Sequence, residues 1–134
     1  WSLVNMLIII ISILFIHFIA DFLFQNSLMA KNKSSNNLPL FVHVVVYSSI
    51  LLIPSFFIFK SPELAWYFAI TNGILHYGVD YITSKLSSYI YKTNQMGTNF
   101  IPNISFWSVI GFDQFLHSFM LLSTLFYFMG WSFQ

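Results

Sequence analysis

Three histidine–aspartate pairs, each with its two residues four positions apart, hold most of the acid–base chemistry of this sequence. The pairs are His17 with Asp21, His76 with Asp80, and Asp113 with His117. On a helix, residues four apart lie on the same face, one turn from each other. The chain has only four acidic residues and four histidines, and three of each are used in these apolar segments. Because a carboxylate is costly in apolar surroundings unless it is paired, the pairs mark a candidate functional site.

Histidine and carboxylate side chains in this pattern predict a metal site, with zinc or manganese as the metal. Seven residues are the predicted ligands: His17, Asp21, His43, His76, Asp80, Asp113 and His117. They exceed the needs of one tetrahedral zinc ion and suffice for two metals with a bridging carboxylate, an arrangement suited to phosphoryl transfer. The central pair, His76 and Asp80, is the predicted catalytic pair. We further expect Gln25, Tyr47 and Gln114 to orient the ligands.

The same residues admit two other interpretations. The cluster could conduct protons or ions, or its hydrogen bonds could hold helices together. A single pair in a membrane helix is more often such a clamp, but three pairs together with His43 favour a functional site. The alternative to a hydrolase is therefore a non-enzymatic subunit of a membrane complex. A cavity that reaches the cluster would distinguish them, because an enzyme needs one and a clamp does not.

The composition is that of an integral membrane protein. Hydrophobic residues make up 57% of the 134 residues and charged residues only 7%, whereas a soluble domain is about one quarter charged. The net charge of +1 offers no basic surface, so nucleic acid is not an expected partner. The absence of cysteine excludes disulfides and thiolate chemistry. The expected partners are the lipid bilayer and other membrane protein subunits.

Four apolar stretches predict four transmembrane helices, approximately over residues 3–24, 39–59, 62–91 and 104–130. Pro39 suits a first helical turn, and Ser61-Pro62-Glu63 forms a helix start with a cap, a proline and an acidic residue. Short connections between the helices predict an all-α, up-down-up-down transmembrane bundle that forms one domain over residues 1–134.

The lysines predict the orientation of this bundle. Loops 26–38 and 92–103 share one side of the membrane, and four of the five lysines belong to that side: Lys31, Lys33, Lys85 and Lys92. The positive-inside rule places these loops in the cytoplasm, with the bacterial inner membrane as the expected location. At about 1.5 Å per residue along antiparallel helices, all seven predicted ligands fall in the half of the bundle nearest these loops.

A family resemblance adds to these inferences. Four motifs carry it: His17-x-x-x-Asp21-x-x-x-Gln25, His43-x-x-x-Tyr47, His76-x-x-x-Asp80 and Asp113-Gln114-x-x-His117. Their order and spacing resemble a small bacterial and phage membrane family catalogued as domain of unknown function 3307, over nearly the whole chain. More loosely, the pattern is similar to inner-membrane proteins described as metal-dependent hydrolases and to the helical zinc phospholipase C and single-strand nuclease group. This second resemblance implies hydrolysis of a phosphoester such as a lipid head group.

Overall fold

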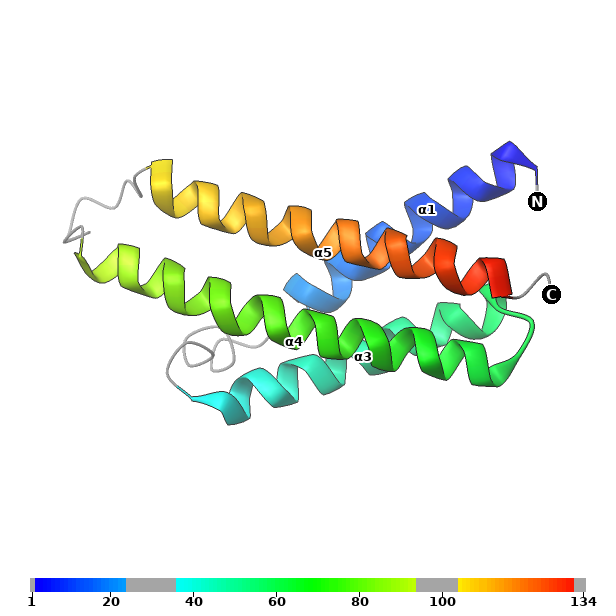
Figure 1. The fold of residues 1–134 in the computed structure, drawn as a ribbon, viewed down its shortest axis with the longest axis horizontal. Helices are drawn as coiled ribbons and strands as arrows, with labels where there is room; N and C mark the ends of the chain where they lie inside the picture. The colour runs from blue at the N-terminus through cyan, green and yellow to red at the C-terminus, as the bar shows by residue number, and fades with distance from the viewer. Residues whose placement is uncertain (1, 24–35, 94–103, 132–134) are drawn as a thin grey trace.

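The computed structural model describes residues 2–23, 36–93 and 104–131 of the chain (Figure 1). Within these ranges there is no strand, and the elements are α1 (Leu3–Phe18), η1 (Ile19–Leu23), α3 (Asn37–Ile58), α4 (Pro62–Thr93) and α5 (Ile104–Trp131). Successive helices run in opposite directions, and the two ends of the chain lie at the same end of the bundle (Figure 1). The predicted all-α, up-down-up-down four-helix fold is therefore confirmed.

Side-chain caps explain where the helices begin. Helix α3 starts two residues before Pro39 because the Asn36 side chain accepts a hydrogen bond from the Leu38 amide at 2.9 Å. Helix α4 starts as predicted, since the Ser61 hydroxyl accepts a hydrogen bond from the Leu64 amide at 3.1 Å. At its other end α4 continues to Thr93, slightly beyond the predicted end.

The first helix differs from the continuous α-helix that its apolar sequence predicts. Helix α1 ends at Phe18 and is followed directly by η1, a π-helical turn of five residues that contains Asp21. A π turn accommodates an additional residue, so the side chains that follow it are rotated relative to the α-helical register. This turn therefore changes the direction in which Asp21 points from the end of α1.

Helix α4 is the central element of the bundle and packs along both α3 and α5, whereas α1 packs mainly against α3. Close approach of α3 and α4 depends on Gly73, because a Cβ atom at that position would lie 2.1 Å from Ser48 Oγ. On the other side of α4, the Asn72 amide donates to Thr124 Oγ1 of α5 at 2.8 Å. Such interhelical hydrogen bonds and small-residue contacts are typical of helix packing in membranes.

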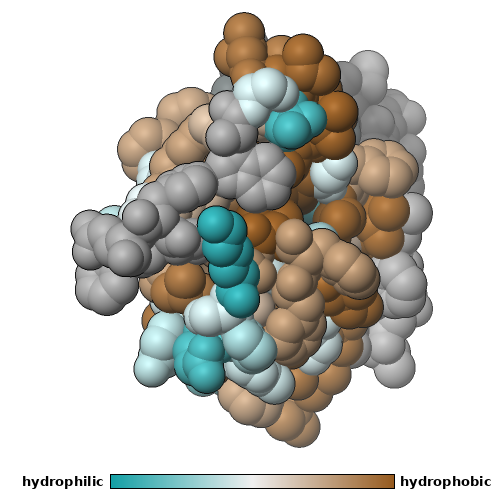
Figure 2. Space-filling model, turned by 90° about the vertical axis from the view of Figure 1, so that its right-hand side faces the viewer, coloured by the Kyte–Doolittle hydropathy of each residue, from teal (hydrophilic) through white to brown (hydrophobic). Residues whose placement is uncertain are grey.

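The outer surface of the bundle is strongly apolar. Viewed from the end where the termini lie, the flanks are mostly hydrophobic, and hydrophilic residues gather on the end itself (Figure 2). Among the described residues, three segments are long and apolar enough to cross a membrane: Leu3–Phe22, Asn37–Ile58 and Phe106–Gly130. These lengths match the hydrocarbon thickness of a bilayer.

Helix α4 is long, but its average composition is less apolar than that of these three segments. The sequence nevertheless predicts it as the fourth transmembrane span. Five of its polar residues are buried within the bundle: Asn72, His76, Asp80, Thr83 and Ser84. Charged residues of α4 are exposed at Glu63, Lys85 and Lys92. The outward face also carries exposed Ile70, Ile74, Ile82 and Leu86. Both sets of polar residues lower the average hydropathy of α4, although much of its outward surface is apolar.

Candidate metal centre

The bundle brings all seven predicted ligand residues together about half-way along α4. Six of them are buried, with at most 4% of their surface exposed: His17, Asp21, His43, His76, Asp80 and His117. Asp113 is less buried, with 13% of its side chain exposed. These residues come from α1, η1, α3, α4 and α5, so the cluster joins every described helix of the fold.

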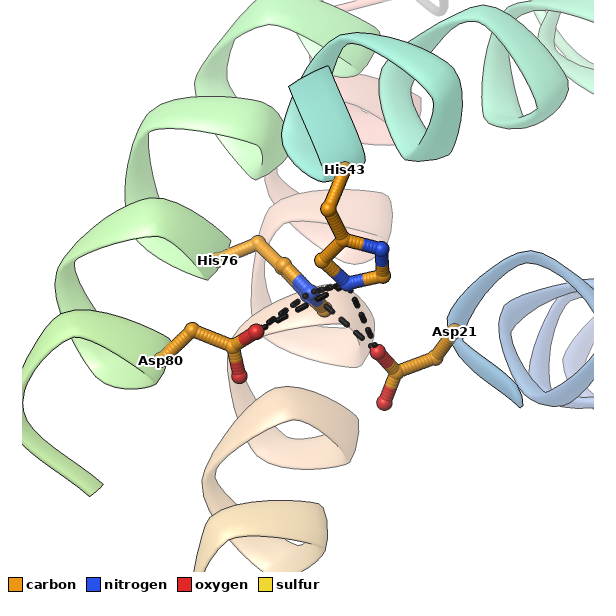
Figure 3. Close-up of side chains that lie close together, drawn as sticks. All are labelled: Asp21, His43, His76 and Asp80. Carbon is orange, nitrogen blue, oxygen red and sulfur yellow. Dashed lines mark hydrogen bonds and ion pairs between the residues drawn. The ribbon is translucent and has the colours of Figure 1, made fainter. Parts of the chain in front are cut away.

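Four of these side chains point their donor atoms at one another (Figure 3). His43 Nε2 lies 3.1 Å from Asp21 Oδ1, 3.1 Å from His76 Nε2 and 3.6 Å from Asp80 Oδ2. His76 Nε2 lies 3.4 Å from Asp21 Oδ1 and 3.6 Å from Asp80 Oδ2. A tetrahedral zinc ion with ligand bonds of 2.0–2.1 Å would separate its donor atoms by about 3.3–3.4 Å. The distances in this group bracket that value.

The two imidazoles direct only one nitrogen each into this group. Their other nitrogens, His43 Nδ1 and His76 Nδ1, are buried and have no hydrogen-bond partner within the described part of the chain. Without an ion, a hydrogen bond between the two facing Nε2 atoms requires one to carry a proton and the other to accept it. A cation between them would instead be bound by both lone pairs and by the two carboxylates.

A second group of potential ligands adjoins the first and consists of Asp21, Asp113 and His117, whose donor atoms lie within 4.8 Å of one another. His117 Nε2 lies 3.4 Å from Asp113 Oδ1 and 3.2 Å from Asp80 Oδ1. The carboxylate of Asp80 thus faces the first group with one oxygen and the second with the other, and Asp21 belongs to both groups. Shared carboxylates of this kind bridge the ions of two-metal centres.

Ring stacking holds the central histidine in place. The ring of His76 lies between Tyr47 and His117, with centroid distances of 4.0 Å on both sides and interplanar angles of 19° and 22°. Tyr47 is buried, and its hydroxyl is 3.1 Å from His17 Nδ1. These contacts restrict rotation of the His76 ring. The predicted role of Tyr47, to orient a metal ligand, would depend on this stacking.

His17 occupies a different position from the other histidines. Its Nδ1 faces the Tyr47 hydroxyl and its Nε2 lies 3.4 Å from Gln114 Oε1. It is part of the cluster, but it belongs to neither group of potential metal ligands found among the described residues. Its role as a ligand stays a prediction, whereas its contacts are those of a residue that positions Tyr47 and Gln114.

Gln114 connects Asp21 of η1 with Asp113 of α5. Its Nε2 donates to Asp21 Oδ2 at 2.9 Å and to Asp113 Oδ2 at 3.1 Å. The amide therefore binds one oxygen of each carboxylate. Whether it orients metal ligands, the role predicted for it, stays a prediction. Gln25, for which the same role is predicted, lies outside the described residues.

Two residues that the sequence interpretation overlooked also belong to the site. Thr83 Oγ1 donates a hydrogen bond to Asp113 Oδ1, and Ser84 is buried one turn beyond Asp80. A signal for both existed, because they lie three and four residues after Asp80, on the helical face that also carries His76. This signal is weak, because hydroxyls in helices commonly bond to their own backbone, as Thr83 also does to the Val79 carbonyl.

The described lysines are exposed, in contrast to the buried cluster. The lysines in the described ranges are Lys60, Lys85 and Lys92, and each has an exposed side chain. Lys85 lies over the ring of Tyr81, 3.6 Å from its centroid. Buried carboxylates need a compensating positive charge, so either protonated histidines or bound cations must supply it here.

A cavity of about 210 Å³ with mostly polar lining residues adjoins the cluster. Its walls come from three elements: Asp21 and Phe22 of η1, Thr83, Ser84 and Ser87 of α4, and Val109, Ile110, Asp113 and Gln114 of α5. Two of the clustered carboxylates thus border a space large enough for several water molecules or a small polar group.

Comparison with known proteins identifies the family but no characterised relative. No curated protein sequence and no solved structure matches the chain. The sequence profile of the family DUF3307, described as a protein of unknown function, matches residues 9–133. This range includes all the residues of both potential metal-binding groups. The chain therefore belongs to the DUF3307 family, the family that its histidine and aspartate motifs resemble.

Proposed function

We propose that this protein is a metal-dependent hydrolase of the membrane and that its substrate is a phosphoester. The observation that carries the proposal is the adjacency of two potential metal-binding groups to a polar cavity. The two groups share Asp21, and Asp80 of the first group also contacts His117 of the second. Two divalent ions held 3.5–4 Å apart stabilise the attacking and leaving oxygens of a phosphoryl transfer. A helix clamp would not need the cavity.

Each part of the cluster has a role in this proposal. His43, His76, Asp21 and Asp80 would hold the inner ion, for which zinc suits the two imidazoles and two carboxylates. Asp113 and His117, together with Asp21, would hold the outer ion, for which zinc or manganese is suitable. Water would add to phosphorus as the P–O ester bond breaks, and the proton lost by this water would pass to the departing alcohol. His76 and Asp80 are the proposed catalytic pair because they lie at the centre of the cluster and would bind the inner ion.

Hydrolysis of a chromogenic phosphodiester, bis(4-nitrophenyl) phosphate, tests this function. Purified protein supplied with Zn²⁺ or Mn²⁺ is expected to release 4-nitrophenol, and the His76→Ala/Asp80→Ala double variant should be slower by about a hundredfold or more. Thr93→Ala is a suitable control because, among the described residues, the hydrogen-bond partners of the Thr93 hydroxyl are the Tyr89 and Ile90 carbonyls of its own helix. Equal rates for the double variant and the control would contradict the proposal.

We also propose that the bundle lies in the bacterial inner membrane with segments 26–38 and 92–103 in the cytoplasm. Segments 24–35 and 94–103 lie outside the described residues, but Lys85 and Lys92 are on the half of α4 that leads to this side. Cysteines introduced at Ser61 and Thr93, at opposite ends of α4, should react with impermeant reagents from opposite sides. We expect Thr93→Cys to be protected in intact cells. Labelling of both cysteines from the same side would show that α4 does not span the membrane.

The alternative function is a non-enzymatic membrane subunit whose cluster holds helices together or passes protons. The bonds of Gln114 to both Asp21 and Asp113 favour it, because they satisfy carboxylate oxygens without a metal. Interhelical hydrogen bonds in membranes contribute about 0.6 kcal/mol on average. Elemental analysis separates the two functions, since a clamp retains no metal after purification.

A further inference from the structure

An apolar groove of about 560 Å³ runs along the outer side of the contact between α4 and α5. Its wall on α4 includes Ile74, Gly78, Ile82 and Leu86, and Phe112 contributes from α5. All four apolar side chains among these are exposed. The length of helix from Ile74 to Leu86 is about 18 Å, slightly more than half of a hydrocarbon core about 30 Å thick. The groove therefore has the length of one alkyl chain in one leaflet.

This groove is separated from the polar cavity by a thin partition. Thr83 and Val109 line both spaces, one from α4 and one from α5. The Thr83 hydroxyl also donates a hydrogen bond to Asp113 Oδ1, so the partition contacts the second potential metal-binding group. A molecule lying in the groove would thus have one end next to the cavity and the cluster.

An unpartnered hydroxyl lies on the cavity side of this partition. Ser84 is more than nine-tenths buried, lines the cavity, and its Oγ has no hydrogen-bond partner among the described residues. Buried polar groups in proteins are nearly always hydrogen-bonded. A ligand oxygen in the cavity would accept a hydrogen bond from this hydroxyl.

The aromatic and basic residues of α4 indicate the depth of the cavity in the membrane. Tyr81 stacks with Tyr77 and supports Lys85, and exposed Tyr89 and Lys92 follow toward the end of the helix. Tyrosines and lysines of this kind mark the head-group level of a bilayer. Ser84, between them in the sequence, lies at this level, while the groove extends from there toward the hydrocarbon centre.

From these observations we infer that the substrate is a membrane amphiphile, whose anionic phosphate head lies in the polar cavity and whose alkyl chain lies in the α4–α5 groove. The inference rests on the proposed function, because bound cations are needed to attract an anion to a cavity bordered by Asp21 and Asp113. A second apolar groove, between α3 and α4, shares no lining residue with the polar cavity and so offers no equivalent route.

The test uses Mn²⁺-loaded protein in nanodiscs and dodecyl phosphate carrying a photoreactive diazirine in its chain. Gly78→Leu fills the groove, and Gly111→Leu is the matched control. A Cβ atom at either glycine meets no atom within 4 Å, so both variants should fold, but only Gly78 lines the groove. Crosslinks should concentrate on Ile82, Leu86 and Phe112 and fall at least about tenfold in Gly78→Leu only, a loss equivalent to about 1.4 kcal/mol.

Two further measurements distinguish the possible failures. Binding of Mn²⁺, followed by electron paramagnetic resonance, tests the metal centre separately, and its absence would overturn the proposed function together with the inference. Bound Mn²⁺ with crosslinks scattered over all lipid-facing helices, or with equal losses in both glycine variants, would overturn the amphiphile inference alone. Equal affinity for inorganic phosphate and dodecyl phosphate would likewise overturn it and indicate a water-soluble substrate.

Replacement of Ser84 by alanine should weaken binding of both phosphates, because the Ser84 hydroxyl is the proposed hydrogen-bond donor to the phosphate head.

Discussion

Replacement of Asp80 by alanine is expected to abolish binding of both metal ions, whereas replacement of His43 or Asp113 should remove only one. Asp80 directs Oδ2 toward His43 and His76 and Oδ1 toward His117, so both groups depend on its carboxylate. His43 belongs only to the first group and Asp113 only to the second. Metal content should therefore fall from about two ions per chain to about none in Asp80→Ala.

Elemental analysis of the purified variants, with zinc titrated by calorimetry, provides this measurement. His17→Ala is an informative control because His17 belongs to neither metal-binding group, and we expect it to retain two ions. Thermal melting of each variant shows whether a loss of metal merely reflects unfolding. Two ions retained by folded Asp80→Ala would contradict the shared-carboxylate arrangement.

Removal of metal by a chelator is expected to lower the melting temperature of the wild-type protein by about 10 °C, reversibly on adding zinc. A ligand present at a hundredfold excess over its dissociation constant stabilises the folded state by about 2.7 kcal/mol, and each kcal/mol shifts the melting temperature of a chain this size by a few degrees. The physical cause is the negative charge of Asp21 and Asp80, which are buried, and of the adjacent, less buried Asp113. A divalent cation would compensate this charge.

The Asp80→Ala variant provides the control for this experiment. Because it should no longer bind metal, its melting temperature should not respond to the chelator. The comparison is made within this variant, with and without chelator, because the substitution itself also changes stability. An unchanged wild-type melting temperature, together with less than about a tenth of an equivalent of transition metal, would favour the helix clamp or proton path instead.

Local sequence determined the helices and identified the residues of the candidate site. Long apolar stretches interrupted by Pro39, Ser61 and Pro62 define the spans, and the structure begins α3 and α4 within two residues of the predicted positions. The i, i+4 spacing of His76 and Asp80 places both on one face of α4. Antiparallel connectivity then requires residues at matching distances along the helices to meet. These features depend on helical periodicity and on short connections, both of which are visible in a sequence.

The tertiary structure alone decided which side chains share a metal group. The π turn rotates Asp21 into contact with His43 and His76 of other helices, and helical periodicity contains no signal for that turn. His17, which like His76 and His117 has an aspartate four positions away, faces Tyr47 and Gln114 instead. Sequence spacing specifies neighbours within one helix. The rotation and closeness of different helices depend on side-chain packing across their interfaces, as at Gly73 and Ser48, and this packing determines which donor atoms converge.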